Sequence, residues 1–283
     1  WGGNDALAIN TGYYSGETIG EIWGFETDRY FTKDDFHTET INGKDVLVLN
    51  KGIATQKGLQ SGSFAFGPGD IKYKDLNNDS IVNGGDLTLA NHGDLKKIGN
   101  STPRYQFSLR FGGDYKGFDI DVYLQGVGKR DYWAIGSLAI PGYSGSSIFY
   151  DHQMDFWTED NPNAKYPNPY QGNSSSTLSG QANWGSSDGV SGNNFYPQTK
   201  YLLNLAYLRV KTLTIGYSLP DALLKKLYLS KLRIYVEGLN LLTFANSKIP
   251  IDPEITDRSS TGSWYGATTP FTKTYSFGVQ LSF

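Results

Sequence analysis

The chain has 283 residues, a formal net charge of −3 and a sequence pI of about 5.6, which excludes the basic surface expected of a nucleic-acid-binding protein. It contains no cysteine, which excludes disulfides, thiol catalysis and zinc sites built on cysteine. Aromatic residues make up 14% of the chain and glycine occurs 34 times, a mixture that suits strands and turns better than helices. We therefore expect an all-β protein.

The apolar residues do not gather into one long run. No stretch approaches the roughly 20 apolar residues that a membrane-spanning helix needs. The strands of a membrane barrel alternate apolar and polar residues, and this pattern is compatible with the mean hydropathy of −0.43. The chain begins at Trp1 rather than at a methionine, so we expect it to be part of a longer protein, with any targeting segment upstream.

The first 70 residues are rich in glycine and threonine and contain short apolar runs. Residues 19–31 (IGEIWGFETDRYF) predict a strand followed by a turn at Thr27 and Asp28. Residues 45–50 predict a second short strand, and residues 33–36 a single helical turn between the two. No catalytic pattern occurs in this part.

Residues 69–86 (GDIKYKDLNNDSIVNGGD) have the spacing of a calcium-binding loop. Ser80 stands where such loops usually have glycine, and the last ligand position holds an aspartate instead of the longer glutamate. One interpretation is a structural calcium site that stiffens the loop. The other is a turn that holds itself together by hydrogen bonds from Asp and Asn side chains to the backbone. The residues at ligand positions 1, 3, 5, 7, 9 and 12 are Asp75, Asn77, Asp79, Ile81 (through its carbonyl), Asn83 and Asp86.

From residue 105 the alternation becomes regular. Apolar and polar residues alternate over 105–112 and again over 118–125, on either side of a short turn at 114–117. The predicted hairpin has one apolar face and one face that carries Arg110, Asp119 and Asp121. In a soluble sandwich the apolar face is core, whereas in a membrane barrel it faces lipid and the charged face borders a wet lumen.

The remaining chain predicts long loops between strands. A connection over residues 132–199 includes a short helix around 149–158, and a strand over 201–219 changes parity near Lys211, which suggests a bulge. Helical turns over 220–229, a strand to residue 244 and a second long loop over 245–270 follow. Short connections after 113 and 219 alternate with long ones after 131 and 244, as outer-membrane barrels require.

The last stretch, residues 272–283 (TKTYSFGVQLSF), alternates again and ends on an aromatic residue, as outer-membrane barrels commonly do. We expect its apolar side chains to face lipid. They are Tyr275, Phe277, Val279, Leu281 and Phe283.

Taken together, these stretches resemble the C-terminal part of SusC/RagA-type TonB-dependent transporters of the Gram-negative outer membrane. The resemblance extends over most of the chain, and its specificity comes from the order and spacing of the pieces. They are residues 19–31, 69–86, 98–126 (IGNSTPRYQFSLRFGGDYKGFDIDVYLQG), 207–220 (YLRVKTLTIGYSLP), 232–244 (LRIYVEGLNLLTF) and 275–283 (YSFGVQLSF).

The resemblance implies a transmembrane antiparallel β-barrel of 22 strands, of which residues 1–283 would form the C-terminal portion, with long extracellular loops. Residues 69–86 would be a calcium-loop-like insertion, and the plug domain and early strands would lie upstream. It also implies multi-pass insertion in the outer membrane, with import of an oligosaccharide or oligopeptide. TonB, reached through the upstream part, would supply energy, and a SusD-like surface lipoprotein would act as a lid.

The residues leave a second function class open and argue against a third. A secreted or surface carbohydrate-binding or adhesin β-sandwich with a structural calcium would share the aromatic residues and the metal loop. We expect no enzyme, because His37, His92 and His152 do not form an HExxH motif and residues 142–145 lack the spacing of a nucleophile elbow.

Tryptophans in the predicted extracellular loops are candidate ligand contacts, because an indole can stack on a sugar or contact a peptide. Packing within the loops, or a place in the aromatic girdle at the membrane interface, is the alternative interpretation for each one. The four are Trp133, Trp157, Trp184 and Trp264.

Overall fold

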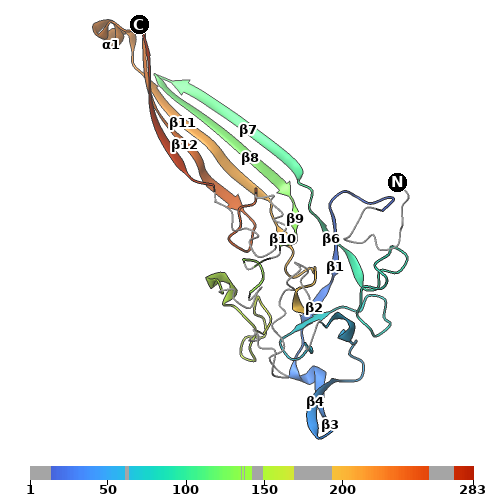
Figure 1. Cartoon of the computed structure of the whole chain (residues 1–283). Coiled ribbons are helices and arrows are strands. Elements are labelled where there is room, and N and C mark those ends of the chain that lie inside the picture. Colours follow the sequence, from blue (N-terminus) through green and yellow to red (C-terminus); the bar gives the residue numbers. More distant parts are fainter. Residues whose placement is uncertain are drawn as a thin grey trace. The chain divides into compact units, whose positions relative to one another are not determined.

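The computed structural model describes residues 14–60, 64–134, 136, 138–141, 149–168, 193–254 and 271–283 (Figure 1). Strands predominate in these ranges, and the one α-helix, α1 (Asp221–Leu224), has four residues. No helix in the described ranges has the length and apolar character to cross a membrane. The chain divides into two compact units, which we describe separately. Unit 1 comprises Trp1–Thr102, Asp131–Leu203 and Thr256–Thr268, and unit 2 comprises Pro103–Arg130, Asn204–Ile255 and Thr269–Phe283.

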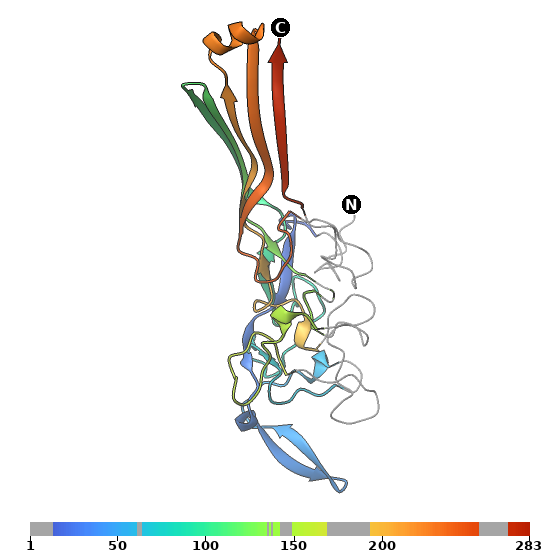
Figure 2. The ribbon, with the colours of Figure 1, turned by 90° about the vertical axis from the view of Figure 1, so that its left-hand side faces the viewer.

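Unit 2 is built on one antiparallel sheet in which strands adjacent in the chain are also adjacent in space. The order is β13-β12-β11-β8-β7, and the structure confirms the predicted hairpin and the three later strands. Figure 2 shows β12 and β13 side by side, with the C-terminus at the same end as the helical turns. The strands are β7 (Arg104–Tyr115), β8 (Phe118–Lys129), β11 (Tyr207–Ser218), β12 (Lys231–Ala245) and β13 (Thr274–Ser282).

The turn between β7 and β8 explains their register. Tyr115 pairs with Phe118, so only Lys116 and Gly117 form the loop, and both have positive φ (49° and 86°). Two central residues with positive φ are the signature of the tight turn whose twist matches paired strands. This turn places Phe107, Leu109, Phe111 and Tyr115 of β7 opposite an apolar residue or a glycine of β8.

The predicted bulge in β11 is confirmed. The pairing of β11 with both neighbours shifts between Val210 and Thr212, which leaves Lys211 as the extra residue. The extra residue restores the alternation, so the apolar side chains before and after it lie on one face.

A helical connection joins β11 to β12, as the sequence predicts. It consists of α1 and a 3₁₀ turn, η5 (Lys225–Leu227), and it ends at Tyr228 in the left-handed conformation with φ 55°. The Leu229 N–H donates to the Leu224 carbonyl at 3.1 Å, which closes the last turn. The connection also holds the end of the chain, because the Ser230 N–H donates to the Ser282 carbonyl at 2.8 Å.

Unit 1 contains short ribbons and turns. Three antiparallel ribbons form it: β1 with β6, β2 with β5, and β3 with β4. Their strands are β1 (Glu21–Phe25), β2 (Thr27–Tyr30), β3 (Phe36–Ile41), β4 (Lys44–Leu49), β5 (Ile71–Tyr73) and β6 (Leu95–Asn100). Two-residue strands are β9 (Asp131–Tyr132), which lies in unit 1, and β10 (Leu203–Asn204), whose first residue belongs to unit 1 and second to unit 2. The 3₁₀ turns are η1 (Lys33–Asp35), η2 (Lys57–Leu59), η3 (Asp151–Gln153) and η4 (Asn193–Phe195).

The predicted turn at Thr27 and Asp28 is wrong. These residues begin β2, which pairs with β5. The pairing shifts between Thr27 and Arg29, so Asp28 is left out of the ladder as a bulge residue. A bulge and a turn leave similar polar breaks in a sequence, and only the partner strand distinguishes them.

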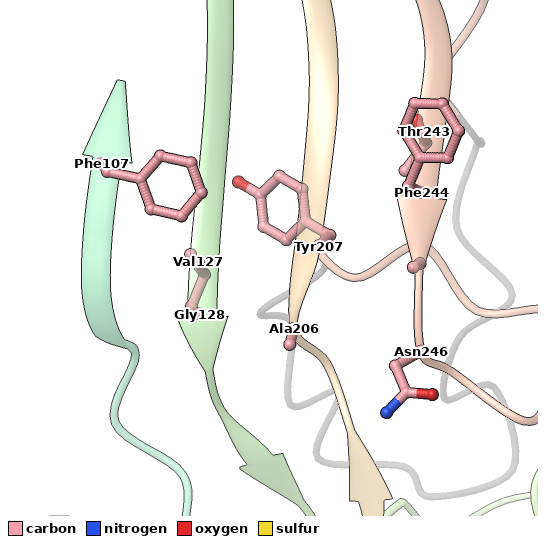
Figure 3. Close-up of a pocket in the computed structure, with 9 residues that line it drawn as sticks. Phe107, Val127, Gly128, Ala206, Tyr207, Thr243, Phe244 and Asn246 are labelled. Carbon is pink, nitrogen blue, oxygen red and sulfur yellow. The ribbon is translucent and has the colours of Figure 1, made fainter. Parts of the chain in front are cut away.

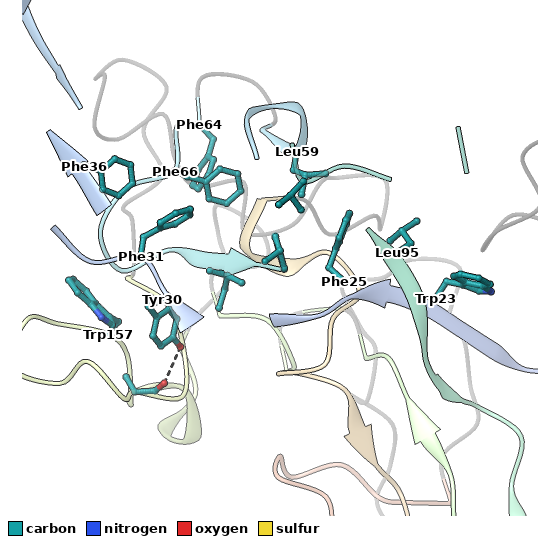
Figure 4. Close-up of a cluster of buried hydrophobic side chains, with 14 of the residues drawn as sticks. Trp23, Phe25, Tyr30, Phe31, Phe36, Leu59, Phe64, Phe66, Leu95 and Trp157 are labelled. Carbon is teal, nitrogen blue, oxygen red and sulfur yellow. Dashed lines mark hydrogen bonds between the residues drawn. The ribbon is translucent and has the colours of Figure 1, made fainter. Parts of the chain in front are cut away.

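The core of unit 1 combines parts of the chain that are far apart in sequence (Figure 4). Phe31 and Ile71 are fully buried in it, and Trp157 and Ala164 join the same cluster. The Tyr30 hydroxyl donates to the Ala164 carbonyl at 3.0 Å. Residues 149–168, predicted as part of a long connection, therefore pack against the N-terminal segment. The predicted helix there is limited to the three residues of η3.

An ion pair between the exposed Arg29 and the buried Asp35 fixes the start of η1. Arg29 donates to both carboxylate oxygens of Asp35, at 2.6 Å each, and the Thr32 N–H donates to the same carboxylate at 2.8 Å. The guanidinium is the main reason that the pKa of Asp35 is lowered, and the Thr32 N–H adds to the effect against the opposing influence of burial.

Candidate functional site

One face of the five-stranded sheet is apolar from edge to edge. Register places Phe277 opposite Val236, Val236 opposite Ile215, and Ile215 opposite Ile120, so one row crosses four strands. All four side chains are exposed. The five residues predicted to face lipid lie on this surface or extend it beyond the strand, and they are exposed: Tyr275 66%, Phe277 83%, Val279 61%, Leu281 51% and Phe283 94%.

Aromatic side chains mark both ends of this apolar face. Tyr105 and Phe107 lie at one end of β7, and Tyr115 and Phe118 lie at the hairpin turn, where the Phe118 ring is 4.6 Å from that of Tyr217. At about 3.4 Å per residue, the ten steps from 105 to 115 cover about 34 Å along the strand. A tilt of about 40° reduces this to about 26 Å, which matches the apolar band of outer-membrane barrels at about 25 Å.

An open hollow of about 610 Å³ lies at the end of the sheet away from the hairpin turn (Figure 3). The Phe107 ring lies over Gly126, where a Cβ atom would stand 2.5 Å from the ring. The glycine therefore makes room for the aromatic side chain. The lining residues are Phe107, Val127, Gly128, Ala206, Tyr207, Thr243, Phe244, Ala245 and Asn246.

The opposite face is polar and carries ion pairs between strands. Arg233 of β12 binds Asp119 of β8 through two hydrogen bonds of 2.8 and 2.5 Å, although β11 runs between these strands. The pair passes over Gly216 of β11, where a Cβ atom would lie 2.4 Å from Asp119 Oδ1 and 2.6 Å from Arg233 Nε. Any other residue at 216 would obstruct the pair.

On the polar face, side-chain contacts continue from Arg233 toward the edge strand β13. The Arg233 guanidinium lies 4.8 Å from the Tyr235 ring centroid, and the Tyr235 ring occupies the space above Gly278 of β13. A second ion pair, Arg110 with Asp121, joins β7 and β8 at 3.0 Å and is more exposed. The sheet thus has a charged, hydrogen-bonded face and an apolar one, as expected where one side faces lipid and the other a polar interior.

The first part of the predicted calcium loop adopts a tight, self-bonded turn. Asp75 accepts hydrogen bonds from the N–H groups of Asn78 (2.7 Å) and Ser80 (2.8 Å), and Asp79 accepts from Ile81 N–H (2.7 Å). Ser80 has φ 68°, so it adopts the left-handed conformation that glycine usually provides at this position. Its departure from the usual residue therefore does not prevent the turn.

The later ligand positions are engaged elsewhere. Asn83 accepts from Gly85 N–H at 2.6 Å, and the Asp86 carboxylate accepts from Asn91 at 2.8 Å. Within the described ranges, no three His, Cys, Asp or Glu side chains are grouped so that they could hold a metal ion. Asp75 and Asp79 thus hold the first part of the loop by accepting from backbone N–H groups, whereas Asp86 bonds to Asn91. Calcium binding at this loop stays a prediction.

The sequence alone does not indicate Asp94, which organises the loop. It is fully buried, and its carboxylate accepts from the N–H groups of Leu76 (2.6 Å) and Asn83 (2.8 Å). A lone aspartate eight residues beyond the loop carries no recognisable spacing. The tertiary fold alone brings it under the turn.

The four tryptophans predicted to contact a ligand have different locations. Trp157 is 8% exposed in the core of unit 1, and its ring fills the space beside Gly69. This favours the packing interpretation for that residue. Trp133 is half-buried, and Trp184 and Trp264 lie outside the described residues. Ligand contact stays a prediction.

Comparison with known proteins reveals similarity to TonB-dependent receptors, although no family model matches the chain. It is 27% identical over 278 residues to TonB-dependent receptor P3 of Formosa agariphila, which covers 95% of this chain and 22% of that receptor. TonB-dependent receptor P26 of the same organism is 22% identical over 221 residues, covering 76% of this chain and 20% of the receptor. The chain therefore spans about a fifth of the length of these relatives.

The fold of the chain is similar to that of solved transporter structures. A structure of the RagAB peptide transporter matches 95% of this chain and 24% of the solved one, with a TM-score of 0.54 and 18% identity. The RagAB peptide importer in a closed-closed state matches 96% and 25%, with a TM-score of 0.51 and 18% identity. The chain is all-β, and these findings confirm its resemblance to the SusC/RagA type of TonB-dependent transporters.

Proposed function

We propose that the chain forms part of a TonB-dependent receptor that imports a large nutrient, an oligosaccharide or an oligopeptide, across the outer membrane of a Gram-negative cell. The observation that carries the proposal is the sheet of unit 2, whose apolar face lies between two aromatic rows and whose opposite face is charged. Similarity to TonB-dependent receptors over 95% of the chain supports it.

The physical argument concerns the apolar face. Burying one large apolar side chain is worth about 1.5–3 kcal/mol, so leaving more than a dozen in water would cost on the order of 20–40 kcal/mol. Lipid removes this cost. A soluble sandwich, the alternative function class, would have to cover the same face with a second sheet, and within unit 2 the described residues leave it exposed.

The proposal includes a partner on the outside of the cell. A SusD-like surface lipoprotein would cover the extracellular end and help to capture the nutrient, and TonB would supply the energy. The similarity in fold to a peptide transporter named RagAB supports import of a large nutrient. The curated relatives name no substrate, so peptide and glycan both stay within the proposal.

We also propose a structural role for calcium at residues 75–86. The spacing of oxygen ligands and the left-handed conformation of Ser80 support it. A bound ion would stiffen the loop and would take no part in transport chemistry.

Single-cysteine labelling tests the membrane assignment, since this part of the chain has no native cysteine. In the full-length receptor, cysteine is placed in turn at Phe277, Val279, Ser276 and Gln280 and carries a spin label. Labels at 277 and 279 should collide with oxygen dissolved in lipid, and labels at 276 and 280 with a water-soluble nickel chelate. Equal accessibility at all four positions would refute the assignment.

Growth measurements test the import function. A strain that lacks the receptor should lose growth on its oligomeric nutrient, and a strain that lacks TonB should behave in the same way. Growth that depends on the receptor but not on TonB would contradict the proposed function while leaving the membrane assignment intact.

A further inference from the structure

A charged cluster lies on the polar face of the sheet where β11 begins. The Arg209 side chain is 2% exposed, and it donates to Asp252 at 2.7 Å and to the Thr243 hydroxyl at 2.8 Å. Its Nη1 atom lies 3.1 Å from Glu254 Oε1, and Lys211 donates to Glu254 Oε2 at 2.7 Å. Two carboxylates are therefore held by two cations in a place with little water.

Both carboxylates belong to the segment that follows β12, residues 246–254, which we call the strap. Two of its apolar side chains, Ile249 and Ile251, are buried, each 7% exposed. Arg130, at the end of β8, donates to the Pro253 carbonyl between the two acids at 3.3 Å. The strap thus presents an Asp-Pro-Glu sequence to three cationic side chains.

The bulge in β11 and an aromatic ring complete this site. Lys211 is the extra residue of the bulge, which brings its ammonium group to the same carboxylate as Arg209. The Phe271 ring centroid lies 4.9 Å from Arg209 Cζ and 5.1 Å from Lys211 Nζ. A guanidinium stacked on a ring, with its planar fork directed at oxygen, is a common arrangement for binding carboxylates.

The energetics of buried charge determine when the strap can move. Withdrawing both acids would take from Arg209 the two anions that neutralise it, and loss of the partner of a buried charge is strongly destabilising. The open state therefore becomes accessible when another anion takes the place of Asp252 and Glu254. A ligand shifts such an equilibrium only by binding one state better than the other.

We propose that Arg209 and Lys211, with Phe271 beside them, form a carboxylate-binding site on the polar face, which the strap closes by inserting its own Asp252 and Glu254. The ligand is a solute with closely spaced carboxylates, from an acidic peptide or from a uronic-acid oligosaccharide. This inference rests on the proposed function, in which the polar face borders the import path, and it names the chemistry of the substrate.

Opening of the strap can be measured by cysteine labelling of the purified full-length receptor. Ile249→Cys places a thiol at a buried position of the strap, and Lys248→Cys places one at the adjacent exposed position. The probes are the end-blocked peptide Asp-Pro-Glu and digalacturonate. Their neutral counterparts, Asn-Pro-Gln and digalactose, are the controls.

We expect at least one acidic probe to accelerate maleimide labelling at position 249 by about fivefold or more, the lower end of ordinary coupling between two sites. The neutral probes should have no effect, and labelling at position 248 should be fast throughout. Which acidic probe acts identifies the peptide or the glycan as the source of the carboxylate.

A variant of the strap provides the second measurement. Asp252→Asn with Glu254→Gln should raise the labelling rate at 249 without any probe and should increase the affinity for the acidic probe by about tenfold. Neutralising the exposed pair on the same face, with Arg110→Gln and Asp121→Asn, is the matched control and should change neither quantity.

The proposal is overturned if neither acidic probe accelerates labelling of the Ile249→Cys receptor nor binds to the strap variant. Both measurements use purified protein without TonB, so they are independent of import. Binding without import would contradict the proposed function and leave the site intact, and import without binding would do the reverse.

Discussion

The ion pair that crosses β11 makes Gly216 a sensitive position in the sheet. In the Gly216→Ala variant the new methyl group would stand 2.4 Å from Asp119 Oδ1 and 2.6 Å from Arg233 Nε. Ordinary contacts of a Cβ atom are 3.4 Å or longer, so the side chains must move apart by about 1 Å. We expect a displacement of that size to weaken the hydrogen bonds of 2.8 and 2.5 Å between the two side chains.

The cost follows from the exposure of the pair. Arg233 is 20% exposed and Asp119 is 28% exposed, so the pair lies between a fully screened surface pair, worth about 0–1 kcal/mol, and a buried one. Hydrogen bonds between charged groups contribute about 1.5–3 kcal/mol. We expect Gly216→Ala to lower the free energy of unfolding by about 1–3 kcal/mol.

Urea unfolding of the full-length receptor in lipid vesicles, followed by tryptophan fluorescence, measures this loss. Gly113→Ala is the matched control, because a Cβ at Gly113 meets no atom within 4 Å in the same sheet. In a background with both Asp119→Ala and Arg233→Ala, the Gly216 substitution should cost little. An equal loss with and without the ion pair would refute the reasoning.

Three further predictions concern the lipid face, the metal loop and the core of unit 1. Phe277→Arg should destabilise the receptor by about 2–4 kcal/mol in vesicles, whereas Ser276→Arg on the polar face should cost clearly less; equal losses would place both side chains in the same medium. Ser80→Gly should raise the free energy of unfolding by up to about 1 kcal/mol, because it removes the strain of a serine in the left-handed conformation. The variant should also bind calcium more tightly in calorimetry. No heat of binding in either protein would disprove the calcium site. Asp35→Asn should lower the free energy of unfolding near neutral pH. Because the pKa of Asp35 is lowered in the folded protein, its contribution to stability is present above its ordinary pKa and is lost as the pH falls through the folded value. The difference in free energy of unfolding between the variant and the native protein should therefore shrink below about pH 3.8. A difference that does not depend on pH would contradict this assignment.

The strands of unit 2 and their two faces could be predicted because the information is local. Alternation with a period of two residues assigns each side chain of residues 105–125 and 275–283 to a face without knowledge of any partner strand. The parity change at Lys211 likewise revealed the bulge before the strand was seen to pair. The terminal strand and its apolar residues follow from the same rule.

The tertiary structure decided which polar residues meet. Asp119 and Arg233 are 114 residues apart, and Arg209 and Asp252 are 43 apart, so no spacing in the sequence connects them. Gly216 looks like any small residue on a polar face until the strands on both sides are known. Trp157 looks like a loop tryptophan until it packs in the core of unit 1. Alternation is a property of one strand, whereas an ion pair, a core and a closed loop require two segments of the chain to meet, and only folding determines where they do.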